Sequence, residues 1–272
     1  MPEGPEIRRA ADQLANAVVG QVLTAAWFSF PHLGPRAAEL VDQRVLAIEP
    51  HGKALLTHFE RGLSLYSHNQ LYGVWKVAKP GQRPQTNRSL RVALTTARRE
   101  ILLYSASEIE LLPTAALSEH PFLAKLGPDV LDARLSEAEV QQRLRGSRFA
   151  GRSLAALLLD QGFLAGMGNY LRSEALFEAC INPALRPRDL DDVQIEALAA
   201  ALLAVPRRSY ATRGVGRRRS SGLRAELQVD HGEAFGFRVF DRAGEPCLAC
   251  GSVIERAEHT GRRLYWCSRC QA

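Results

Sequence analysis

Two pairs of cysteines near residue 260 have the spacing of a metal site. Cys247 and Cys250 lie in CLAC, Cys267 and Cys270 lie in CSRC, and 16 residues separate the pairs. Each C-x2-C pair lets two thiolates meet one tetrahedral metal ion, and the double pattern is typical of zinc ribbons and zinc fingers. Four cysteine ligands leave no open coordination position, so the sequence predicts one structural Zn2+ rather than a catalytic ion.

The residues between the two pairs alternate as in a β-hairpin, with Thr260 and Gly261 at its tip. Arg262 and Arg263 would then lie at that tip. A segment this short cannot fold by burying its own core, so metal binding must supply most of its stability, roughly 10 to 16 kcal/mol in small fingers. The fifth cysteine, Cys180, is expected to be a buried helix residue.

The chain begins MPEGPEI, which combines a helix start with two unexplained residues. Pro5 suits a first helical turn and Glu6 suits its positive dipole end. Apolar residues then follow at helical spacing: Ile7, Ala11, Leu14 and Val18. Pro2 and Glu3 precede this helix, so helix formation does not account for them.

Lysine is rare in this chain, and arginine supplies most of the positive charge. The four lysines are Lys53, Lys76, Lys79 and Lys125. An amine is a compact donor that can titrate, which a guanidinium cannot do. Lys53 follows a turn in EPHGKALLTHF, at the start of an apolar strand, where a plain surface charge is the alternative interpretation.

A glycine-rich turn joins two helical stretches in LLLDQGFLAGMGNYLRSEALF. Gly166 and Gly168 allow a close approach of the backbone to a ligand. We expect Asn169 to cap the second helix and its first amides to face outward, which is a geometry that binds phosphate. A helical hairpin with a glycine turn is the alternative.

The net charge of +6 is unevenly placed. One cluster contains Arg213, Arg217, Arg218, Arg219 and Arg224, and a second contains Arg256, Arg262, Arg263 and Arg269. Such clustering indicates a polyanionic partner, with a solvated basic face as the alternative. No apolar run approaches the roughly 20 residues of a membrane span and no secretory signal is visible, so we expect a soluble, cytoplasmic protein without a membrane partner.

The elements that must position these residues change in type along the chain. Residues 21–112 contain short apolar runs between turn signals, which predicts a β-sandwich or barrel. The runs are Val22 to Phe30, Arg44 to Ile48, Ala54 to Phe59, Leu63 to Tyr66, Gly73 to Val77, Leu90 to Thr95 and Ile101 to Tyr104.

From about Ala115 the pattern becomes helical. Ser136 with Glu139 forms a capping box, and Asp189 to Ala204 carries apolar residues at helical intervals. The segment 214–230 is basic without a core pattern, and we interpret it as a loop or linker. The fold class is therefore α+β, and we expect a sandwich domain over 1–130, a helical domain over 131–230 and a zinc finger over 231–272.

Four separated motifs occur in an order that resembles the Fpg/Nei family of DNA glycosylases. They are PEGPEI, the strand segments HGKALL and SHNQLYG, the turn QGFLAGMGNYLRSE, and a finger ending RRLYWCSRCQ. The resemblance covers essentially the whole chain. Within the family, the chain most closely resembles the endonuclease VIII group. It implies a helix-two-turn-helix domain and a glycosylase and abasic-site lyase of base excision repair.

The resemblance also implies catalytic roles. After removal of Met1, the secondary amine of Pro2 would attack C1′ of the deoxyribose and form a Schiff base, and Glu3 would act as general acid and base. Lys53 would assist β-elimination at the sugar or its phosphate. An arginine of the finger would promote δ-elimination; composition allows Arg262 or Arg263, and the family pattern counted back from Cys267 favours Arg262.

Contacts to double-stranded DNA follow from the same resemblance. Gln70, Leu71 and Tyr72 would fill the gap that a flipped nucleotide leaves, although they would otherwise be read as a hairpin turn packed on the sandwich. Asn169 and Lys125 would hold phosphates, with Lys125 standing where related sequences carry arginine.

PEGPEI and the segment Gln70-Leu71-Tyr72 favour oxidised pyrimidines as substrates. We expect abasic sites to be cleaved as well. A formamidopyrimidine or 8-oxoguanine type of glycosylase is the alternative within the family. A non-catalytic zinc-dependent DNA-binding protein is the alternative outside it. We expect a monomer that acts in the bacterial cytoplasm and is associated with the nucleoid through DNA.

Overall fold

The computed structural model describes residues 2–212, 215–216, 235–259 and 261–272. These residues form two compact units. The first holds Pro2 and Glu6–Lys125, and the second holds Glu3–Pro5 with the described residues of Leu126–Ala272. Pro2 and Glu3 are therefore neighbours in the chain that belong to different units.

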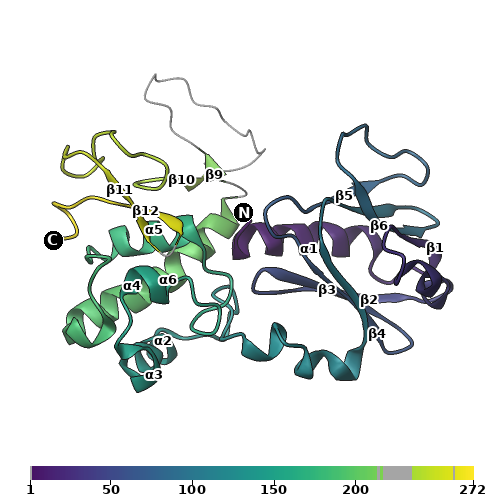
Figure 1. The fold of residues 1–272 in the computed structure, drawn as a ribbon, viewed down its shortest axis with the longest axis horizontal. Coiled ribbons are helices and arrows are strands. Elements are labelled where there is room, and N and C mark those ends of the chain that lie inside the picture. The colour runs from purple at the N-terminus through teal and green to yellow at the C-terminus, as the bar shows by residue number, and fades with distance from the viewer. Residues whose placement is uncertain (1, 213–214, 217–234, 260) are drawn as a thin grey trace. The chain divides into compact units, whose positions relative to one another are not determined.

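The first unit contains two antiparallel four-stranded sheets, drawn in Figure 1. Their strand orders are β1-β6-β7-β5 and β2-β3-β4-β8. The strands are β1 Leu23–Phe28, β2 Val45–His51, β3 Ala54–Phe59, β4 Leu63–His68, β5 Val74–Ala78, β6 Leu90–Thr96, β7 Glu100–Tyr104 and β8 Glu108–Pro113. Short 3-10 helices cover Gly34–Leu40, Thr114–Glu119 and Leu123–Lys125.

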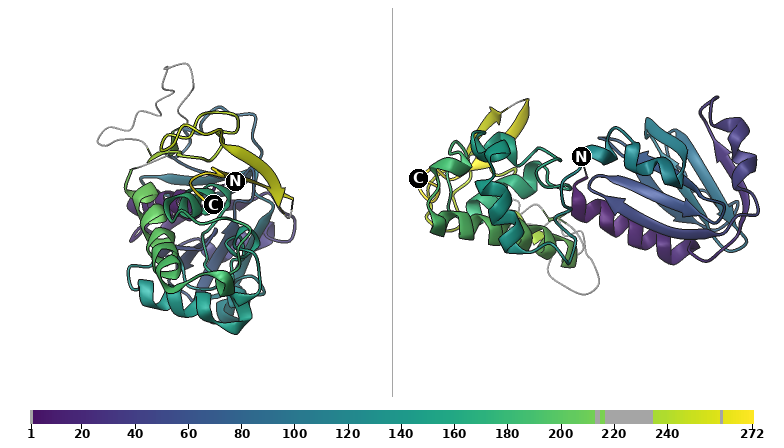
Figure 2. Two further views of the ribbon diagram at one scale, coloured as in Figure 1. Left: turned by 90° about the vertical axis from the view of Figure 1, so that its left-hand side faces the viewer. Right: turned by 90° about the horizontal axis from the view of Figure 1, so that it is seen from below.

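One apolar core joins these sheets to α1 (Gly4–Val18), which runs beside the strands in Figure 2. The helix buries Ile7, Ala11, Leu14 and Val18, the four positions whose spacing predicts it. Both sheets contribute inward side chains, including Leu55 and Leu65 from one and Leu94 and Leu103 from the other. The observed architecture is the sandwich that the strand pattern predicts.

The second unit is helical with a β-hairpin. Its helices are α2 Glu137–Arg145, α3 Ser147–Ala150, α4 Leu154–Leu157, α5 Asn169–Glu178 and α6 Asp192–Ala211, with a 3-10 turn at Pro187–Asp189. Its strands are β9 Val215–Gly216, β10 Phe235–Gly236, β11 Glu255–His259 and β12 Arg262–Trp266. Helix α5 packs against both α6 and β12. The predicted capping box of Ser136 and Glu139 is present at the start of α2.

Three local expectations differ from the structure. Strand β8 was not anticipated as a separate run. Helix α6 continues through Pro206 to Ala211 instead of ending near Ala204. Cys180 is exposed and has φ of +56° just after α5, so the expectation of a buried helix residue is wrong. Of the expected loop 214–230, only residues 215–216 are described, and the remainder lies outside the described residues.

Candidate active site and metal centre

The carboxylate of Glu3 lies at the N-terminal end of α5. Its Oε1 accepts a hydrogen bond from the backbone N–H of Tyr170 at 2.9 Å, and its Oε2 accepts one from Leu171 at 3.2 Å. The side chain is only 4% exposed. Because a helix N-terminus carries partial positive charge and free N–H groups, it holds this carboxylate in one orientation.

Two glycines of the turn make this approach possible. A Cβ on Gly168 would lie 2.2 Å from Cδ of Glu3, so any side chain there would displace the carboxylate. Gly166 has φ of +91°, a conformation that L side chains rarely adopt, and its carbonyl accepts a hydrogen bond from the N–H of Gly4 at 2.8 Å. The glycine pattern therefore accommodates the N-terminal segment of the same chain.

The expected capping by Asn169 is wrong. Gly168 occupies the N-cap position, and Asn169 is the first residue of α5. The amides that were expected to face outward instead bind Glu3. The amides of Tyr170 and Leu171 are occupied, so they are not available for the phosphate contact expected at this turn, whereas the side chain of Asn169 is half-buried.

Arg172, one turn into α5, is a fully buried charge that sequence reasoning missed. Its two terminal nitrogens donate to the carbonyls of Ala155 at 2.5 Å and Arg263 at 2.8 Å, so it joins α4 and β12 to α5. Burial lowers its pKa to about 10; Glu3 opposes the shift and Arg262 adds to it. An arginine in a helix flanked by the apolar residues Leu171 and Ala175 was the available signal.

The finger arginines begin strand β12. Strands β11 and β12 pair with His259 opposite Arg262 and Glu258 opposite Arg263, which is the predicted hairpin; Thr260 lies outside the described residues. Both arginine side chains are exposed. The backbone carbonyl of Arg263 accepts a hydrogen bond from Arg172 at 2.8 Å, which leaves the Arg263 side chain outside this contact.

The four cysteines of the finger converge on one point. Their sulfur atoms all lie within 4.8 Å of one another. The Sγ atoms of Cys247 and Cys270 are 3.9 Å apart, and those of Cys250 and Cys267 are 3.5 Å apart. A tetrahedral zinc ion with Zn–S bonds of about 2.3 Å requires sulfur atoms about 3.8 Å apart.

Lys53 and Pro2 lie in the first unit and are both partly exposed. Lys53 follows Gly52, whose φ is +60°, in the tight turn between β2 and β3. Lys53 precedes Ala54, which pairs with His68 at the end of β4. Burial lowers the pKa of His68, and the positive charge of Lys53 adds to this shift. Lys125 is exposed at the end of a 3-10 helix.

The segment Gln70-Leu71-Tyr72, here called the wedge, follows β4 in the first unit. Leu71 is 57% exposed and Tyr72 is 68% exposed, so neither packs on the sandwich as the alternative interpretation would require. The main chain turns back at Gly73, whose N–H donates to the carbonyl of Asn69 at 2.7 Å. A Cβ on Gly73 would lie 2.6 Å from that carbonyl oxygen, so the turn requires glycine.

Comparisons with known proteins cover all three parts of the chain. Residues 1–107 match the formamidopyrimidine-DNA glycosylase N-terminal domain, 126–220 match the formamidopyrimidine-DNA glycosylase H2TH domain, and 244–272 match the zinc finger found in FPG and IleRS. Proteins named Endonuclease 8 from Escherichia coli (strain K12 / DH10B) and Klebsiella pneumoniae (strain 342) are each 53% identical over 271 residues. Both matches cover 100% of each chain. The chain belongs to the Fpg/Nei family of DNA glycosylases.

Solved structures of the family agree with this fold. A complex between the LlFpg protein, a THF-DNA and an inhibitor matches with a TM-score of 0.81, 22% identity and 100% coverage of both chains. A complex of Lactococcus lactis Fpg with DNA containing an abasic site matches with a TM-score of 0.81, 21% identity and 99% coverage of both. At these identities the likeness shows the fold alone, and the 53% relatives carry the assignment to base excision repair.

In this DNA glycosylase the cysteine cluster is the site of one structural zinc ion. The sulfur separations fit the ion, and the turn backbone supports them: the N–H of Cys247 donates to the carbonyl of Ser252 at 2.7 Å. Gln271 is fully buried and accepts from the N–H of Cys267 at 3.0 Å while donating to the carbonyl of Ile181. The finger is thereby tied to the loop after α5.

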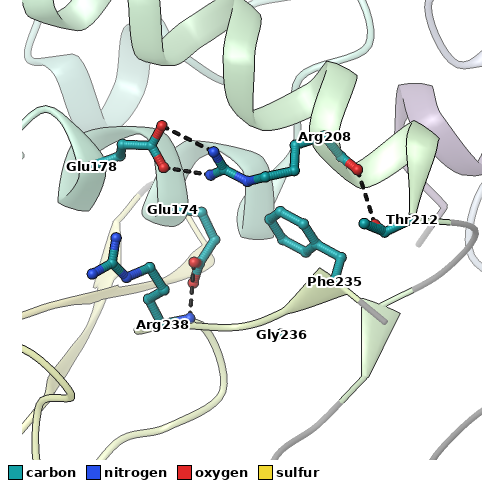
Figure 3. A pocket seen from close by; sticks show the side chains of 7 residues that line it. All are labelled: Glu174, Glu178, Arg208, Thr212, Phe235, Gly236 and Arg238. Carbon is teal, nitrogen blue, oxygen red and sulfur yellow. Dashed lines mark hydrogen bonds and ion pairs between the residues drawn. The ribbon is translucent and has the colours of Figure 1, made fainter. Parts of the chain in front are cut away.

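The glycosylase also has a pocket of about 260 Å³ beside α5, α6 and β10, shown in Figure 3. Glu178 and Arg208 form an ion pair across one side of it. Glu174 is buried and accepts from the backbone N–H of Arg238, so its carboxylate is already used to hold the chain that leads to the finger. No helix in the described part of the chain is long and apolar enough to cross a membrane.

Proposed function

We propose that this glycosylase removes oxidised pyrimidines from double-stranded DNA and cleaves the resulting abasic site by β,δ-elimination. The observation that carries the proposal is the fixed Glu3 carboxylate, which directly follows Pro2 in the chain and is held by two backbone N–H groups. The relatives named Endonuclease 8 support the same group of enzymes.

Pro2 is the nucleophile in this proposal. Once Met1 is removed, the secondary amine forms a bond to C1′ while the bond between C1′ and the base breaks, and the base leaves with a proton. Opening of the sugar breaks the C1′–O4′ bond, Glu3 supplies the proton to O4′, and an iminium ion remains. A secondary amine reaches this iminium without losing a further proton from nitrogen.

The lyase steps are assigned to two basic residues, Lys53 and Arg262. Removal of a C2′ proton and departure of the 3′ phosphate complete β-elimination, with Lys53 beside the sugar or its phosphate. Removal of a C4′ proton and departure of the 5′ phosphate from C5′ complete δ-elimination, which we assign to Arg262. The family pattern counted back from Cys267 supports Arg262 over Arg263.

DNA binding is assigned to the wedge and to two phosphate contacts. The exposure of Leu71 and Tyr72 supports their insertion where a nucleotide has been flipped out. Half-buried Asn169 would contact one phosphate, and exposed Lys125 would contact another. We expect the protein to act on DNA as a monomer in the bacterial cytoplasm.

The test combines substrate preference with covalent trapping. Duplexes that carry dihydrouracil or 8-oxoguanine should be cleaved in that order of preference, and borohydride should trap a covalent complex on the dihydrouracil duplex. A form with an N-terminal extension should lose the complex, whereas Pro2→Gly, which keeps a terminal primary amine in place of the secondary amine, should form less of it. Faster cleavage at 8-oxoguanine would assign the alternative substrate class, and the absence of any adduct would contradict the enzyme mechanism.

A further inference from the structure

We propose that Glu108 and Ser107 are positioning residues for the wedge, and that Gln70 anchors the loop to β8 while Leu71 and Tyr72 enter the duplex. This inference rests on the proposed function, because it concerns how the enzyme fills the gap beside a flipped nucleotide. It changes the expected role of Gln70 from a DNA contact to a support for its two neighbours.

Both ends of the Gln70 amide are engaged within the first unit. The hydroxyl of Ser107 donates to Oε1 of Gln70 at 2.8 Å, and Nε2 of Gln70 donates to Oε1 of Glu108 in a short, charge-assisted hydrogen bond. Glu108 begins β8 and Ser107 directly precedes it, and β8 pairs along its length with β4, the strand that leads into the wedge. The Gln70 side chain therefore points back to the sheet.

The main chain of the wedge is held as well. The N–H of Gln70 donates to Nδ1 of His68 at 3.2 Å, and Gln70 itself has φ of +48°, a left-handed conformation that is unusual for a residue with a side chain. The guanidinium of Arg88 donates to the carbonyl of Tyr72 at 2.6 Å. The loop is fixed at its start and at its end, and the amide of Gln70 adds the third support.

The side chains of the wedge divide into two kinds. Gln70 is partly buried and hydrogen-bonded, whereas Leu71 and Tyr72 are more than half exposed. Apolar and aromatic side chains are those that replace stacking in a disrupted duplex. A rigid loop that presents them before binding avoids the entropic cost of ordering them on DNA.

The charge of Glu108 supports a specific role. Its carboxylate is 51% exposed beside a loop that must approach phosphates, in a chain with net charge +6. A negative charge at this position opposes DNA binding through repulsion. The hydrogen bond to Gln70 explains why a carboxylate is useful here despite this repulsion. Glu110, two residues along the same strand, does not contact Gln70, and its Oε1 instead lies 3.4 Å from Nε2 of His120.

A double-mutant cycle tests the inference. We expect Glu108→Ala and Gln70→Ala each to lower the single-turnover rate on a dihydrouracil duplex by about tenfold, because each removes the same charge-assisted bond. The double variant should be no slower than the slower single variant. Ser107→Ala should have a smaller effect, and Glu108→Gln should retain most of the rate because its amide oxygen can still accept from Gln70.

Two controls separate positioning from other causes. A single-stranded abasic oligonucleotide has no gap in a duplex for the wedge to fill, so Glu108→Ala should cleave it at the unmodified rate. Glu110→Ala should leave the rates on the duplex and on the single-stranded oligonucleotide unchanged. Additive effects of Gln70→Ala and Glu108→Ala, equal loss on both substrates, or a faster Glu108→Ala enzyme would overturn the inference. If the unmodified enzyme does not cleave the abasic oligonucleotide, the proposed function fails and the inference fails with it.

Discussion

The Glu3 carboxylate accepts a hydrogen bond from the backbone N–H of Tyr170 at 2.9 Å, across 167 positions of the chain. The start of the chain is thereby bound to the N-terminus of α5, and the glycines at 166 and 168 provide the space for it. The glycine-rich turn and the N-terminal motif are two halves of one arrangement. In the proposed mechanism this arrangement keeps the general acid next to the nucleophile.

Adding a methyl group to Gly168 should therefore inactivate the enzyme. In Gly168→Ala the new Cβ would lie 2.2 Å from Cδ of Glu3 and would displace the carboxylate from Tyr170 and Leu171. Loss of positioned acid-base catalysis lowers rates by about 10² to 10⁴. Single-turnover base excision measures the effect. Gly151→Ala is the matched control because a Cβ there meets no atom within 4 Å; equal activity of the two variants would remove Glu3 from this role.

The two finger arginines should differ in their effect on the products. Arg262→Ala should stop the reaction after β-elimination, leaving an unsaturated aldehyde on the 3′ end in place of a phosphate. Arg263→Ala should leave the product ratio unchanged, because its contact to Arg172 is made by the backbone carbonyl. Gel separation of the two 3′ ends measures the ratio, and a reversed pattern would transfer the role to Arg263.

Lys125 should contribute one phosphate contact. Lys125→Ala should weaken binding about equally for different DNA sequences and lower the slope of log K against log salt concentration by roughly 1. Lys79→Ala, which removes another exposed lysine of the first unit, should not change the slope. Titrations by fluorescence anisotropy at several salt concentrations decide the point, and an unchanged slope in Lys125→Ala would exclude the contact.

The stability of the first unit should fall below neutral pH. Burial lowers the pKa of His68 from 6.5, an effect that Glu108 opposes and Lys53 reinforces. The unfolded chain therefore binds this proton more readily, and the stabilisation present above pH 6.5 is lost as the pH falls through the lower pKa of the folded state. In addition, a proton on Nδ1 would remove the acceptor for the N–H of Gln70.

His68→Asn is the variant that tests this pH dependence, because an amide oxygen can accept from Gln70 without titrating. Thermal unfolding between pH 7.5 and 5 should show a smaller decrease in Tm for His68→Asn than for the unmodified protein. Identical pH profiles would show that His68 does not titrate differently in the folded and unfolded states.

Local patterns predicted the features that depend on local chemistry. The cysteine spacing specifies a cluster because each pair forms its own turn around the metal, and Ala54–Phe59 was predicted with its observed bounds because turn residues flank an apolar run. Strand β8 escaped prediction because Glu108 and Glu110 interrupt its apolar residues. The helical pattern was noted over Asp189 to Ala204, whereas α6 spans Asp192–Ala211 and continues through the buried Pro206.

The arrangement around α5 could not be predicted from local patterns. Asn169 is a good capping residue by type, but a carboxylate from the other end of the sequence occupies the amides that it was expected to leave open. Arg172 likewise makes its contacts with α4 and β12, which lie 17 and 91 positions away in sequence. Such contacts follow from tertiary packing rather than from residue spacing.

The most direct test of the proposed mechanism is the identity of the residue that becomes attached to DNA. The borohydride-reduced complex with a dihydrouracil duplex should be digested with protease and nuclease and analysed by tandem mass spectrometry. The account predicts a sugar remnant on the nitrogen of Pro2 in a peptide that lacks Met1. A remnant on Lys53, or an active enzyme that retains Met1, would contradict it.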